Sequence, residues 1–357
     1  MSYIAIVYGT RPEAIKLAPL VKELRTGGGP HQIICTGQHS TLLENCPLPH
    51  DVRFELMEPS QKPAAFVARA LTTLTDLWDG PDRPARVVVQ GDTATAFAAT
   101  LAAFHLGIPV AHVEAGLRSD DMAAPFPEEG YRVMIDRIAT THYVATERPA
   151  RNLLDEGIDF RSIFITGNTG IDGAMAAAAR GGRSAGVGKA PYVLATLHRR
   201  EAFGEPMASV CRAIRMLADE RLHFIVPMHP NPLARSVIRE ELGSNPNVSL
   251  IEPLPYDDLI ATLRGAWATL TDSGGIQEEA PSFGIPVLVA REVTERPEAI
   301  ESGNAQLVGW DMAAIVNFVR HLQSSPDVYR QMATVRHVFG DGHAAERIAQ
   351  DLRRQLE

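Results

Sequence analysis

The chain has 357 residues, of which 45% are hydrophobic and 22% are charged, and its formal net charge is -9 at pH 7. At roughly 150 residues per domain, this length favours two globular domains. The net negative charge disfavours a nucleic-acid partner, because affinity for a phosphate backbone depends on many Lys and Arg side chains.

The cysteines, the first residues and the most apolar segment indicate the cellular compartment of the protein. Cys35, Cys46 and Cys211 lie far apart and form no C-x-x-C pair, so we expect buried thiols and neither a disulfide nor a zinc site. The first residues are strand-like and lack the basic region and cleavage site of a secretory signal. The segment Ala94–Val113 is interrupted by His, Gly and Pro, so we do not expect it to span a membrane. These features predict a soluble cytoplasmic protein without a membrane partner.

Short β-rich runs alternate with helix-like segments along the chain, a pattern typical of βαβ units around parallel sheets. A glycine-rich stretch at 181–188 separates two groups of such runs. We therefore predict an α/β fold with two Rossmann-like, doubly wound parallel-sheet domains that face each other across a cleft. The expected strands are Tyr3–Tyr8, Gln32–Thr36, Arg86–Gln90, Pro109–Val113, Tyr192–Thr196, Phe224–Pro227, Val248–Ile251, Ala268–Thr271 and Pro286–Val289.

In open parallel sheets, ligands bind outside the carboxyl ends of the strands, so the residues that directly follow strands are the candidates for chemistry. No strict G-x-G-x-x-G follows a predicted strand, which disfavours a dinucleotide cofactor. The sequence also lacks the patterns of haem, zinc and P-loop sites. We therefore expect no cofactor and no metal.

The first predicted strand is followed by a turn and a helix. Gly9 permits a tight turn, and Pro12 suits the first position of a helix. Arg11 would lie where the helix begins, so a diphosphate there would meet both a guanidinium group and a helix N-terminus. The alternative is an exposed Arg11 on a solvated first turn. Pro19 within the same helix should lower the stability of the helix locally, because proline cannot donate a backbone hydrogen bond.

Carboxylates follow two further strands of the first half. Asp92 comes after the strand Arg86–Gln90 and Glu114 after the next one, an arrangement typical of acid/base chemistry. Asp92 is equally suited to be the N-cap of a helix that starts at Thr93. Glu114 is harder to explain structurally, because the strand before it should be buried on both faces and a carboxylate there needs a partner.

A proline-punctuated loop then enters a helix with Glu128, Glu129 and Arg132, and these carboxylates are suited either to catalysis or to helix capping. In the second half, His198 and His229 each directly follow a strand. Lone histidines more often pack or cap, but histidine also needs the least pKa adjustment for proton transfer near neutrality.

The most specific signal is Leu270–Ala280. A strand ends at Asp272, and the turn Ser273-Gly274-Gly275 lets backbone N–H groups approach phosphate oxygens at the start of a helix. Glu279 lies about one helical turn further on, within reach of a ribose diol, and Arg296 supplies another cation for the same diphosphate. The alternative is a plain turn between strand and helix.

Together these motifs resemble the non-hydrolysing bacterial UDP-N-acetylglucosamine 2-epimerases, a family that shares the two-domain architecture of the GT-B glycosyltransferases. The resemblance covers nearly the whole chain. It is carried by GTRPEAIK (Gly9–Lys16), GDT (Gly91–Thr93), HVEAGLR (His112–Arg118), PEE (Pro127–Glu129), TGNT (Thr166–Thr169), HRRE (His198–Glu201), HPNP (His229–Pro232), TDSGGIQEEAP (Thr271–Pro281), TERPEA (Thr294–Ala299) and GDG (Gly340–Gly342).

The resemblance implies a set of site residues. It places the nucleotide against Arg11, Ser273, Gly274, Gly275, Glu279 and Arg296, with Leu254, Tyr256 and Leu259 on the uracil side. It places the sugar near Lys16 and Arg132 and near the catalytic candidates Asp92, Glu114, Glu128 and His198. Gln38, His39, Arg69, Arg199 and His229 match an allosteric site for a second substrate molecule.

The resemblance also implies the organisation of the protein. Residues 1–168 and 342–357 would form the N-terminal Rossmann-like domain, with the last helix crossing back to it, and residues 169–341 the UDP-binding domain. The family further implies a homodimer.

The implied reaction is reversible epimerisation at C2 of UDP-N-acetylglucosamine to UDP-N-acetylmannosamine, which serves surface polysaccharide synthesis. Because C2 is not next to a carbonyl, its proton cannot be removed to a simple enolate. Elimination of UDP to a glycal followed by re-addition needs no cofactor, only stabilisation of the diphosphate and acid/base groups. The alternatives are a hydrolysing 2-epimerase that releases N-acetylmannosamine and UDP, a GT-B glycosyltransferase, and a catalytically silent nucleotide-sugar sensor.

Overall fold

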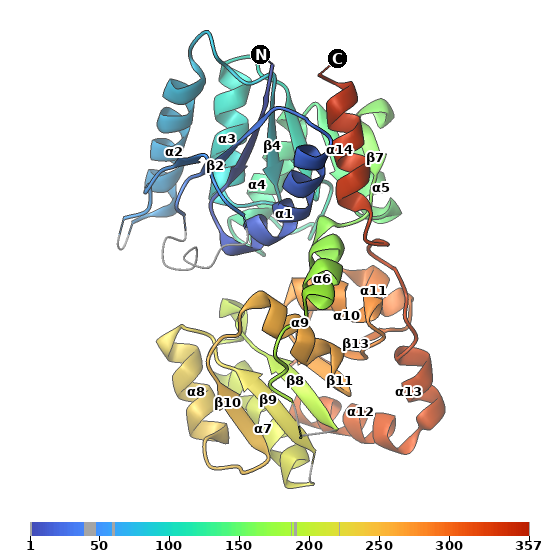
Figure 1. Cartoon of the computed structure of the whole chain (residues 1–357). Helices are drawn as coiled ribbons and strands as arrows, with labels where there is room; N and C mark the ends of the chain where they lie inside the picture. The colour runs from blue at the N-terminus through green and yellow to red at the C-terminus, as the bar shows by residue number, and fades with distance from the viewer. Residues whose placement is uncertain are drawn as a thin grey trace. The chain divides into compact units, whose positions relative to one another are not determined.

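The structure is a computed structural model that describes residues 2–38, 48–58, 61–186, 188, 191–220 and 222–356. The chain divides into two compact units (Figure 1). Unit 1 consists of Met1–Gly173 and Phe339–Glu357, and unit 2 of Ala174–Val338.

Unit 1 contains, among its described residues, a seven-stranded sheet in the order β3-β2-β1-β4-β5-β6-β7, in which every pair of neighbours is parallel. Its central strands read as continuous apolar runs because helices cover both faces of the sheet. The strands are β1 Ile4–Tyr8, β2 His31–Cys35, β3 Val52–Arg53, β4 Arg86–Gln90, β5 Val110–Val113, β6 Thr141–Val144 and β7 Ile163–Ile165.

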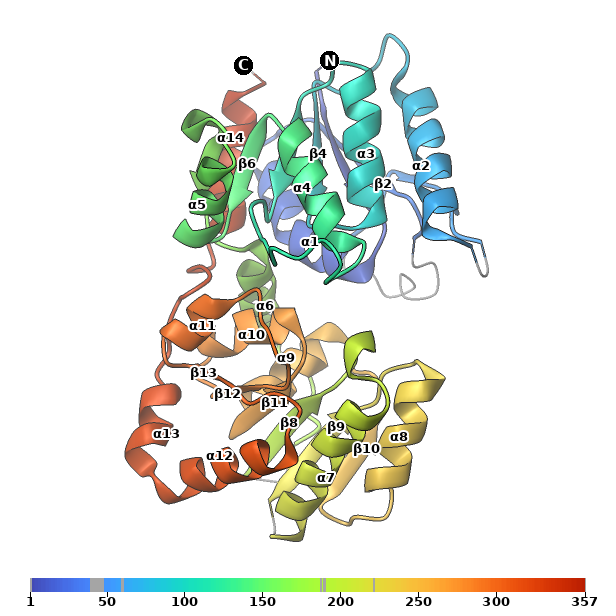
Figure 2. The same cartoon turned by 180° about the vertical axis from the view of Figure 1, so that it is seen from behind.

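The two faces of this sheet carry different helices. Ile4 and Ile6 of β1 pack with α1 and α14, which are far apart in sequence and lie side by side (Figure 1). Ala5 and Val7 point the other way and pack with α2 and α3 (Figure 2). The helices are α1 Arg11–Thr26, α2 Pro63–Trp78, α3 Ala94–His105, α4 Glu128–Ile138, α5 Glu147–Asp155, α6 Thr169–Arg180, which continues into unit 2, α14 Ala344–Arg354 and the 3-10 turn Phe160–Ser162.

Unit 2 contains, within its described residues, a six-stranded parallel sheet in the order β10-β9-β8-β11-β12-β13. Its strands are β8 Tyr192–Thr196, β9 His223–Pro227, β10 Val248–Ile251, β11 Ala268–Thr271, β12 Val287–Val289 and β13 Ala305–Leu307. Its helices are the 3-10 turn Arg200–Ala202, α7 Glu205–Asp219, α8 Pro232–Leu242, α9 Tyr256–Arg264, α10 Gly274–Ser282, α11 Pro297–Glu301, α12 Met312–Ser324 and α13 Pro326–Met332. The predicted α/β class with two doubly wound parallel sheets is confirmed.

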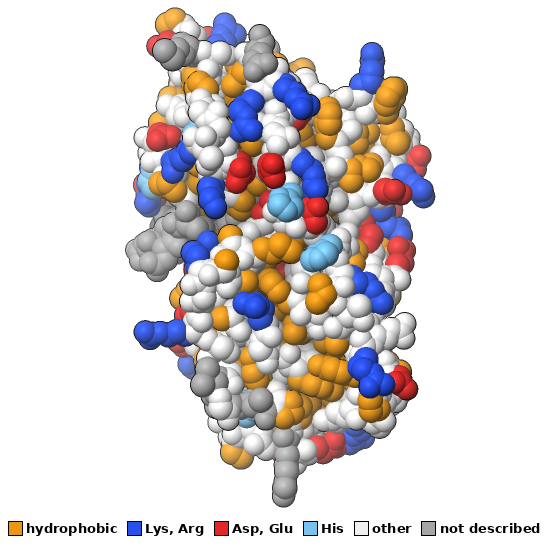
Figure 3. All heavy atoms as spheres, turned by 45° about the vertical axis from the view of Figure 1, so that its right-hand side comes forward, with side chains coloured by type: hydrophobic (Ala, Val, Ile, Leu, Met, Phe, Trp, Pro, Cys, Tyr) orange, Lys and Arg blue, Asp and Glu red, His pale blue; other side chains and the backbone are white. Residues whose placement is uncertain are grey.

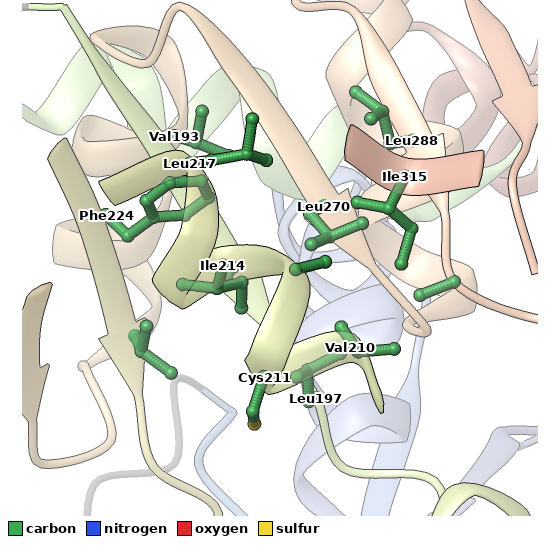
Figure 4. Packing of buried hydrophobic residues seen from close by; sticks show 14 of the residues in the cluster. Val193, Leu197, Val210, Cys211, Ile214, Leu217, Phe224, Leu270, Leu288 and Ile315 are labelled. Carbon is green, nitrogen blue, oxygen red and sulfur yellow. The ribbon is translucent and has the colours of Figure 1, made fainter. Parts of the chain in front are cut away.

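The core of unit 2 forms where α7 lies on the sheet. Ile214 and Leu217 of α7 pack with Phe224 of β9 and Leu270 of β11 (Figure 4). Cys211 belongs to the same cluster, and burial raises the pKa of its thiol to about 12.

The expectation of buried thiols is confirmed for Cys35 and Cys211, whereas Cys46 lies outside the described residues. No described helix has the length and the apolar composition needed to cross a bilayer. On the face seen in Figure 3, Lys and Arg are interspersed with Asp and Glu, and its described part shows no continuous basic stripe.

The nine predicted strands are all present, and their ends agree within one residue. The prediction missed β3, β6, β7 and β13. These are short, and β3, β7 and β13 lie at sheet edges, where a strand needs no continuous apolar run. Helix α1 begins at Arg11, so Pro12 is its second residue and not its first.

The compact units divide the chain near, but not at, the limits 168/169 and 341/342 expected from the family pattern. Asn168 donates its N–H to the carbonyl of Phe339 at 2.7 Å. Asp172 accepts the N–H groups of Ala344 and Ala345 at 3.3 and 2.8 Å. These hydrogen bonds hold the start of α6 and the segment from Phe339 in unit 1.

Candidate active site

The turn between β1 and α1 is organised by a buried carboxyl group. Thr10 is the N-cap of α1 and forms a capping box with Glu13. The Glu13 side chain accepts the N–H groups of Gly9 and Thr10 at 3.0 and 2.8 Å and the hydroxyl of Thr93 at 2.7 Å. Glu13 is 1% exposed, and burial raises its pKa to about 7, against the effect of these hydrogen bonds. Arg11 therefore begins α1 at a firmly anchored helix N-terminus, as the sequence predicted.

Glu114 follows β5 in an unusual backbone conformation. Its φ is 68°, in the left-handed region that non-glycine residues rarely adopt. The N–H groups of Glu114 and Ala115 both donate to the carbonyl of Tyr143, at 3.0 and 3.1 Å, which fixes this bend. Strained backbone of this kind is common at functional sites, where the surroundings over-determine it.

The carboxylate of Glu114 has the partners that its burial requires. Its side chain is 8% exposed and pairs with the ammonium group of Lys16. The amide of Gln90, the last residue of β4, donates to the same oxygen at 2.5 Å. The structure thus brings Lys16 and Glu114 together across 98 positions of sequence. Gln90 was not among the predicted site residues, although its place at the end of a strand could have indicated it.

A second network supports the loop after β5. His112 contacts Asp136 with Nδ1 at 2.6 Å and the carbonyl of Gly91 with Nε2 at 2.8 Å. Asp136 also accepts the N–H of Gly116 at 3.1 Å and pairs with Arg118 at 2.9 Å. Burial by itself raises the pKa of Asp136, but His112 and Arg118 bring it below its usual value. His112, Gly116 and Arg118 of the HVEAGLR motif thus all contact Asp136 and hold the loop that carries Glu114.

Asp92 is paired with Arg132, which lies on α4. The side chain of Asp92 is half-buried, and the guanidinium group of Arg132 also contacts Glu129 at 3.2 Å. The alternative interpretation of Asp92 as an N-cap is wrong, because Thr93 caps α3 by accepting the N–H of Ala96 at 3.0 Å. The carboxylate of Asp92 is therefore not used to start the helix.

Glu128 and Glu129 begin α4 after Pro127, which is the N-cap. A proline has no N–H, so the capping-box alternative does not apply to these carboxylates. Glu129 is buried and accepts the N–H groups of Ser119 and Asp120 at 3.0 and 3.3 Å. Glu128 is only partly buried. Of the two, Glu129 supports the loop and Glu128 is the one suited to meet a ligand.

In unit 2, a turn connects β11 to α10. Ser273 is the N-cap and Gly274 the first residue of α10. A Cβ at Gly274 would lie 2.7 Å from Cζ of Arg296, so the guanidinium group lies directly over the helix N-terminus. Arg296 donates from Nε to Glu278 at 2.8 Å and contacts Glu295 at 3.3 Å. The turn, the helix N-terminus and Arg296 together can hold a diphosphate.

Glu279 lies one turn along α10 and accepts the hydroxyl of Tyr256 at 2.6 Å. Burial and the charge of Glu279 raise the pKa of Tyr256 well above its usual value, so this phenol stays a donor. Tyr256 begins α9, and Leu259 lies one turn further along the same helix. Leu254 directly precedes Pro255, the N-cap of α9, and is half-buried, as are Tyr256 and Leu259. The structure therefore joins Glu279, predicted to contact the ribose, to Tyr256, one of the residues predicted on the uracil side.

His198 follows β8 and contacts a residue that the prediction did not include. Asp272, which follows β11, is fully buried and lies 2.9 Å from Nδ1 of His198. Its other oxygen accepts the N–H groups of His198 and Arg199 at 2.8 and 2.9 Å. Burial by itself raises the pKa of Asp272, but these hydrogen bonds and the charge of His198 bring it below its usual value.

The residues matched to an allosteric site are divided between the units. In unit 1, Gln38 accepts the N–H and the hydroxyl of Thr95 at 3.1 and 2.8 Å, and Arg69 pairs with Glu58 at 2.7 Å. His39 lies outside the described residues. In unit 2, burial and the charges of Arg291 and Arg296 lower the pKa of Arg199.

His229 lies beside His198, with ring centroids 6.0 Å apart. Its Nδ1 accepts the N–H of Asn231 at 3.2 Å, and Asn231 caps α8. His229 thus has a local structural role, which is the packing or capping role that the sequence predicted as the alternative to catalysis. Within the described part of the chain, no group of three or more His, Cys, Asp and Glu side chains is arranged to hold a metal ion.

The family comparisons agree with the predicted resemblance. The sequence profile of the family described as UDP-N-acetylglucosamine 2-epimerase matches residues 22–353. UDP-N-acetylglucosamine 2-epimerase of Bacillus subtilis (strain 168) is 41% identical over 360 residues, covering 98% of this chain and 94% of that protein. The crystal structure of UDP-GlcNAc 2-epimerase from Neisseria meningitidis bound to UDP-GlcNAc has a TM-score of 0.91 and 35% identity, covering 99% of this chain and 100% of that one.

The S. aureus MnaA–UDP co-structure is similarly close, with a TM-score of 0.92 and 38% identity, and covers 100% of this chain and 97% of that one. The resemblance therefore extends over the whole length of sequence and fold. The chain belongs to the UDP-N-acetylglucosamine 2-epimerase family.

Proposed function

We propose that this protein is a non-hydrolysing UDP-N-acetylglucosamine 2-epimerase, which interconverts UDP-N-acetylglucosamine and UDP-N-acetylmannosamine. The observation that carries the proposal is the carboxylate set at one edge of the unit 1 sheet. There Glu114 is held by Lys16 and Gln90, and Asp92 by Arg132. The names of the relatives support the 2-epimerase reaction, and two similar proteins have been solved with UDP-GlcNAc or UDP bound.

The reaction proceeds by elimination and re-addition of UDP. A base takes the C2 proton, the electron pair of that C–H bond forms the C1=C2 double bond, and the C1–O bond breaks with its pair going to the diphosphate. The resulting glycal is protonated at C2 from the opposite face while the diphosphate oxygen adds again to C1. Each step balances without an oxidant, which agrees with the absence of a dinucleotide fingerprint from the sequence.

The leaving diphosphate needs stabilisation as its negative charge grows. We assign this role to Arg11 at the start of α1, to Arg296, and to the N–H groups of the turn Ser273–Gly275. Helix N-termini and guanidinium forks are preorganised for phosphate oxygens, so little reorganisation is needed when the bond breaks. Glu279 and Tyr256 hold the ribose, which keeps its form throughout.

Positive charge that develops at C1 needs an anionic partner, and C2 needs acid/base groups on both faces. Glu114, Asp92, Glu128 and His198 are the groups we assign to these roles. In the resting protein, Lys16 and Arg132 neutralise Glu114 and Asp92.

We further propose that the protein acts as a cytoplasmic homodimer in surface polysaccharide synthesis. Gln38, His39, Arg69, Arg199 and His229 would form its allosteric site for a second substrate molecule. Support for these features comes from the family pattern at the matching positions.

Proton NMR of the purified protein with UDP-N-acetylglucosamine in D2O tests the proposal directly. We expect UDP-N-acetylmannosamine with deuterium at C2, formed without added metal or nicotinamide. Accumulation of free N-acetylmannosamine with an equal amount of UDP would instead identify a hydrolysing enzyme. Protium retained at C2 of the product would exclude the elimination route, and turnover that depends on an added acceptor would identify a glycosyltransferase.

A further inference from the structure

The strands β8 and β11 are neighbours in the unit 2 sheet, with Thr196 opposite Thr271 in the parallel register. The residues that follow them therefore emerge side by side at the same sheet edge. Asp272 is the first residue after β11, and His198 is the second after β8. The sheet register thus places the backbone of His198 beside Asp272.

The two oxygens of Asp272 have different contacts. Oδ2 accepts the N–H groups of His198 and Arg199, which fixes the backbone after β8. Oδ1 lies 2.9 Å from Nδ1 of His198. An ionised carboxylate only accepts hydrogen bonds, so this distance favours a proton on the ring nitrogen that faces the carboxylate. The neutral imidazole then has its lone pair on Nε2.

The two side chains of this pair differ in their exposure to solvent. The carboxylate of Asp272 is fully buried, whereas the side chain of His198 is 39% exposed. A solvent-accessible imidazole backed by a buried carboxylate can take a proton on Nε2, and the carboxylate stabilises the imidazolium that forms. Neither feature is needed for a histidine that only packs.

We propose that Asp272 is a positioning residue that holds His198 in the Nδ1–H form, with Nε2 as the nitrogen that exchanges a proton with the substrate. This inference rests on the proposed epimerase function for the role of His198. Because Asp272 directly precedes the turn Ser273–Gly275, one buried side chain also links the acid/base histidine to the diphosphate-binding turn.

The competing explanation is that Asp272 only fixes the loop after β8. The substitution Asp272→Asn separates the two roles. The Asn carbonyl oxygen can still accept the N–H groups of His198 and Arg199, whereas its NH2 group now faces Nδ1 and donates to it. The backbone hydrogen bonds are kept, but the neutral imidazole must carry its proton on Nε2.

The experiment begins with 15N-labelled protein and imidazole 15N–1H correlation spectra at a pH where histidines are neutral. The signals of His198 are assigned among the 12 histidines by comparison with His198→Gln. We expect the Nδ1–H tautomer in the unsubstituted protein and the Nε2–H tautomer in Asp272→Asn. This readout does not depend on turnover, so it tests the geometry even if the proposed reaction is wrong. An Nε2–H tautomer in the unsubstituted protein overturns the inference.

The second measurement is the rate of epimerisation. We expect Asp272→Asn to lower kcat by about 10²-fold or more, within the usual contribution of general acid–base catalysis, with UDP affinity by calorimetry nearly unchanged. Thr196→Val is the matched control, because it removes a hydroxyl that bonds to Thr271 at 2.5 Å on the same strand edge without touching His198. Near-normal kcat in a UDP-binding Asp272→Asn protein with the changed tautomer would overturn the positioning role.

Discussion

The two sheets are both parallel, but the charged candidates at their carboxyl edges are arranged differently. In unit 1, two of the catalytic candidates are carboxylates that pair with a cation: Glu114 with Lys16 and Asp92 with Arg132. In unit 2, the candidate cation Arg296 lies over a helix N-terminus and is held by Glu278 and Glu295. A doubly wound sheet therefore fixes the positions of functional groups at its edge, whereas the sequence determines their charges.

The two edges also differ in how the backbone approaches the ligand. In unit 1, a non-glycine residue, Glu114, occupies left-handed space and is held there by hydrogen bonds. In unit 2, Gly274 leaves room that a Cβ would fill. With the proposed roles, the strained backbone presents a side chain for chemistry, and the glycine leaves room for backbone N–H groups to bind the diphosphate.

The largest effect should come from removing the charge of Glu114 at the unit 1 edge. Glu114→Gln keeps the size and an oxygen that can accept from Lys16 and Gln90, but loses the anion. We expect kcat to fall by about 10²-fold or more while calorimetric UDP affinity changes little. Glu147→Gln, on the exposed surface of α5, is the matched control. A folded variant that binds UDP and turns over normally would remove Glu114 from the catalytic groups.

Two buried carboxyl groups, Glu13 in unit 1 and Asp272 in unit 2, should change the stability of the fold with pH in opposite directions. The pKa of Glu13 is raised to about 7 by burial, so the folded protein keeps this proton at a pH where the unfolded chain loses it. Its contribution to stability is complete below the unfolded pKa and is lost as pH rises through about 7. The pKa of Asp272 is lowered, so its contribution is lost as pH falls.

Glu13→Gln tests this difference, because Gln resembles the protonated form and can donate to Thr93. Urea unfolding between pH 5 and 8 should show a decline in the free energy of unfolding with rising pH, on the order of 2 kcal/mol, that Glu13→Gln removes. An equal decline in both proteins would show that the Glu13 carboxyl is not the group responsible.

In unit 2, Glu279→Ala should mainly weaken binding. Glu279 is assigned to the ribose, which does not change during the reaction, so its loss affects ground state and transition state alike. We expect KM to rise about tenfold with kcat nearly constant, the effect of one hydrogen bond to a charged group. Tyr256→Phe, which keeps Glu279 but removes its 2.6 Å donor, should show a smaller rise. A large loss of kcat in Glu279→Ala would contradict the division of roles between the edges.

The smallest effect should come from the glycine turn. A Cβ at Gly274 meets Arg296 at 2.7 Å, whereas at Gly275 its nearest contact is 3.9 Å away. Gly274→Ala must therefore displace a guanidinium group that Glu278 and Glu295 hold, and we expect a loss of about 1 kcal/mol in the free energy of unfolding. Gly275→Ala should be neutral or slightly stabilising without ligand. Chemical denaturation of both variants checks this, and equal stabilities would contradict it.

Much of the architecture was readable from local sequence. The central strands are continuous apolar runs because helices cover both faces, so nine strands and the two-sheet class could be predicted. The missed strands are short, such as β3 and β13, where pairing partners decide whether extended chain becomes sheet. The candidate positions after strands were also predictable, because parallel strands expose their carboxyl ends at one edge.

The pairings at those positions were decided by tertiary structure alone. Lys16 and Glu114 are 98 residues apart, and Asp272 contacts the N–H of His198 across 74 residues. The motifs indicated which side chains reach a sheet edge, but not which of them would neutralise, orient or bury one another. That depends on strand order and register, because hydrogen-bonded neighbours in these sheets are distant in sequence and only the folded sheet makes them adjacent.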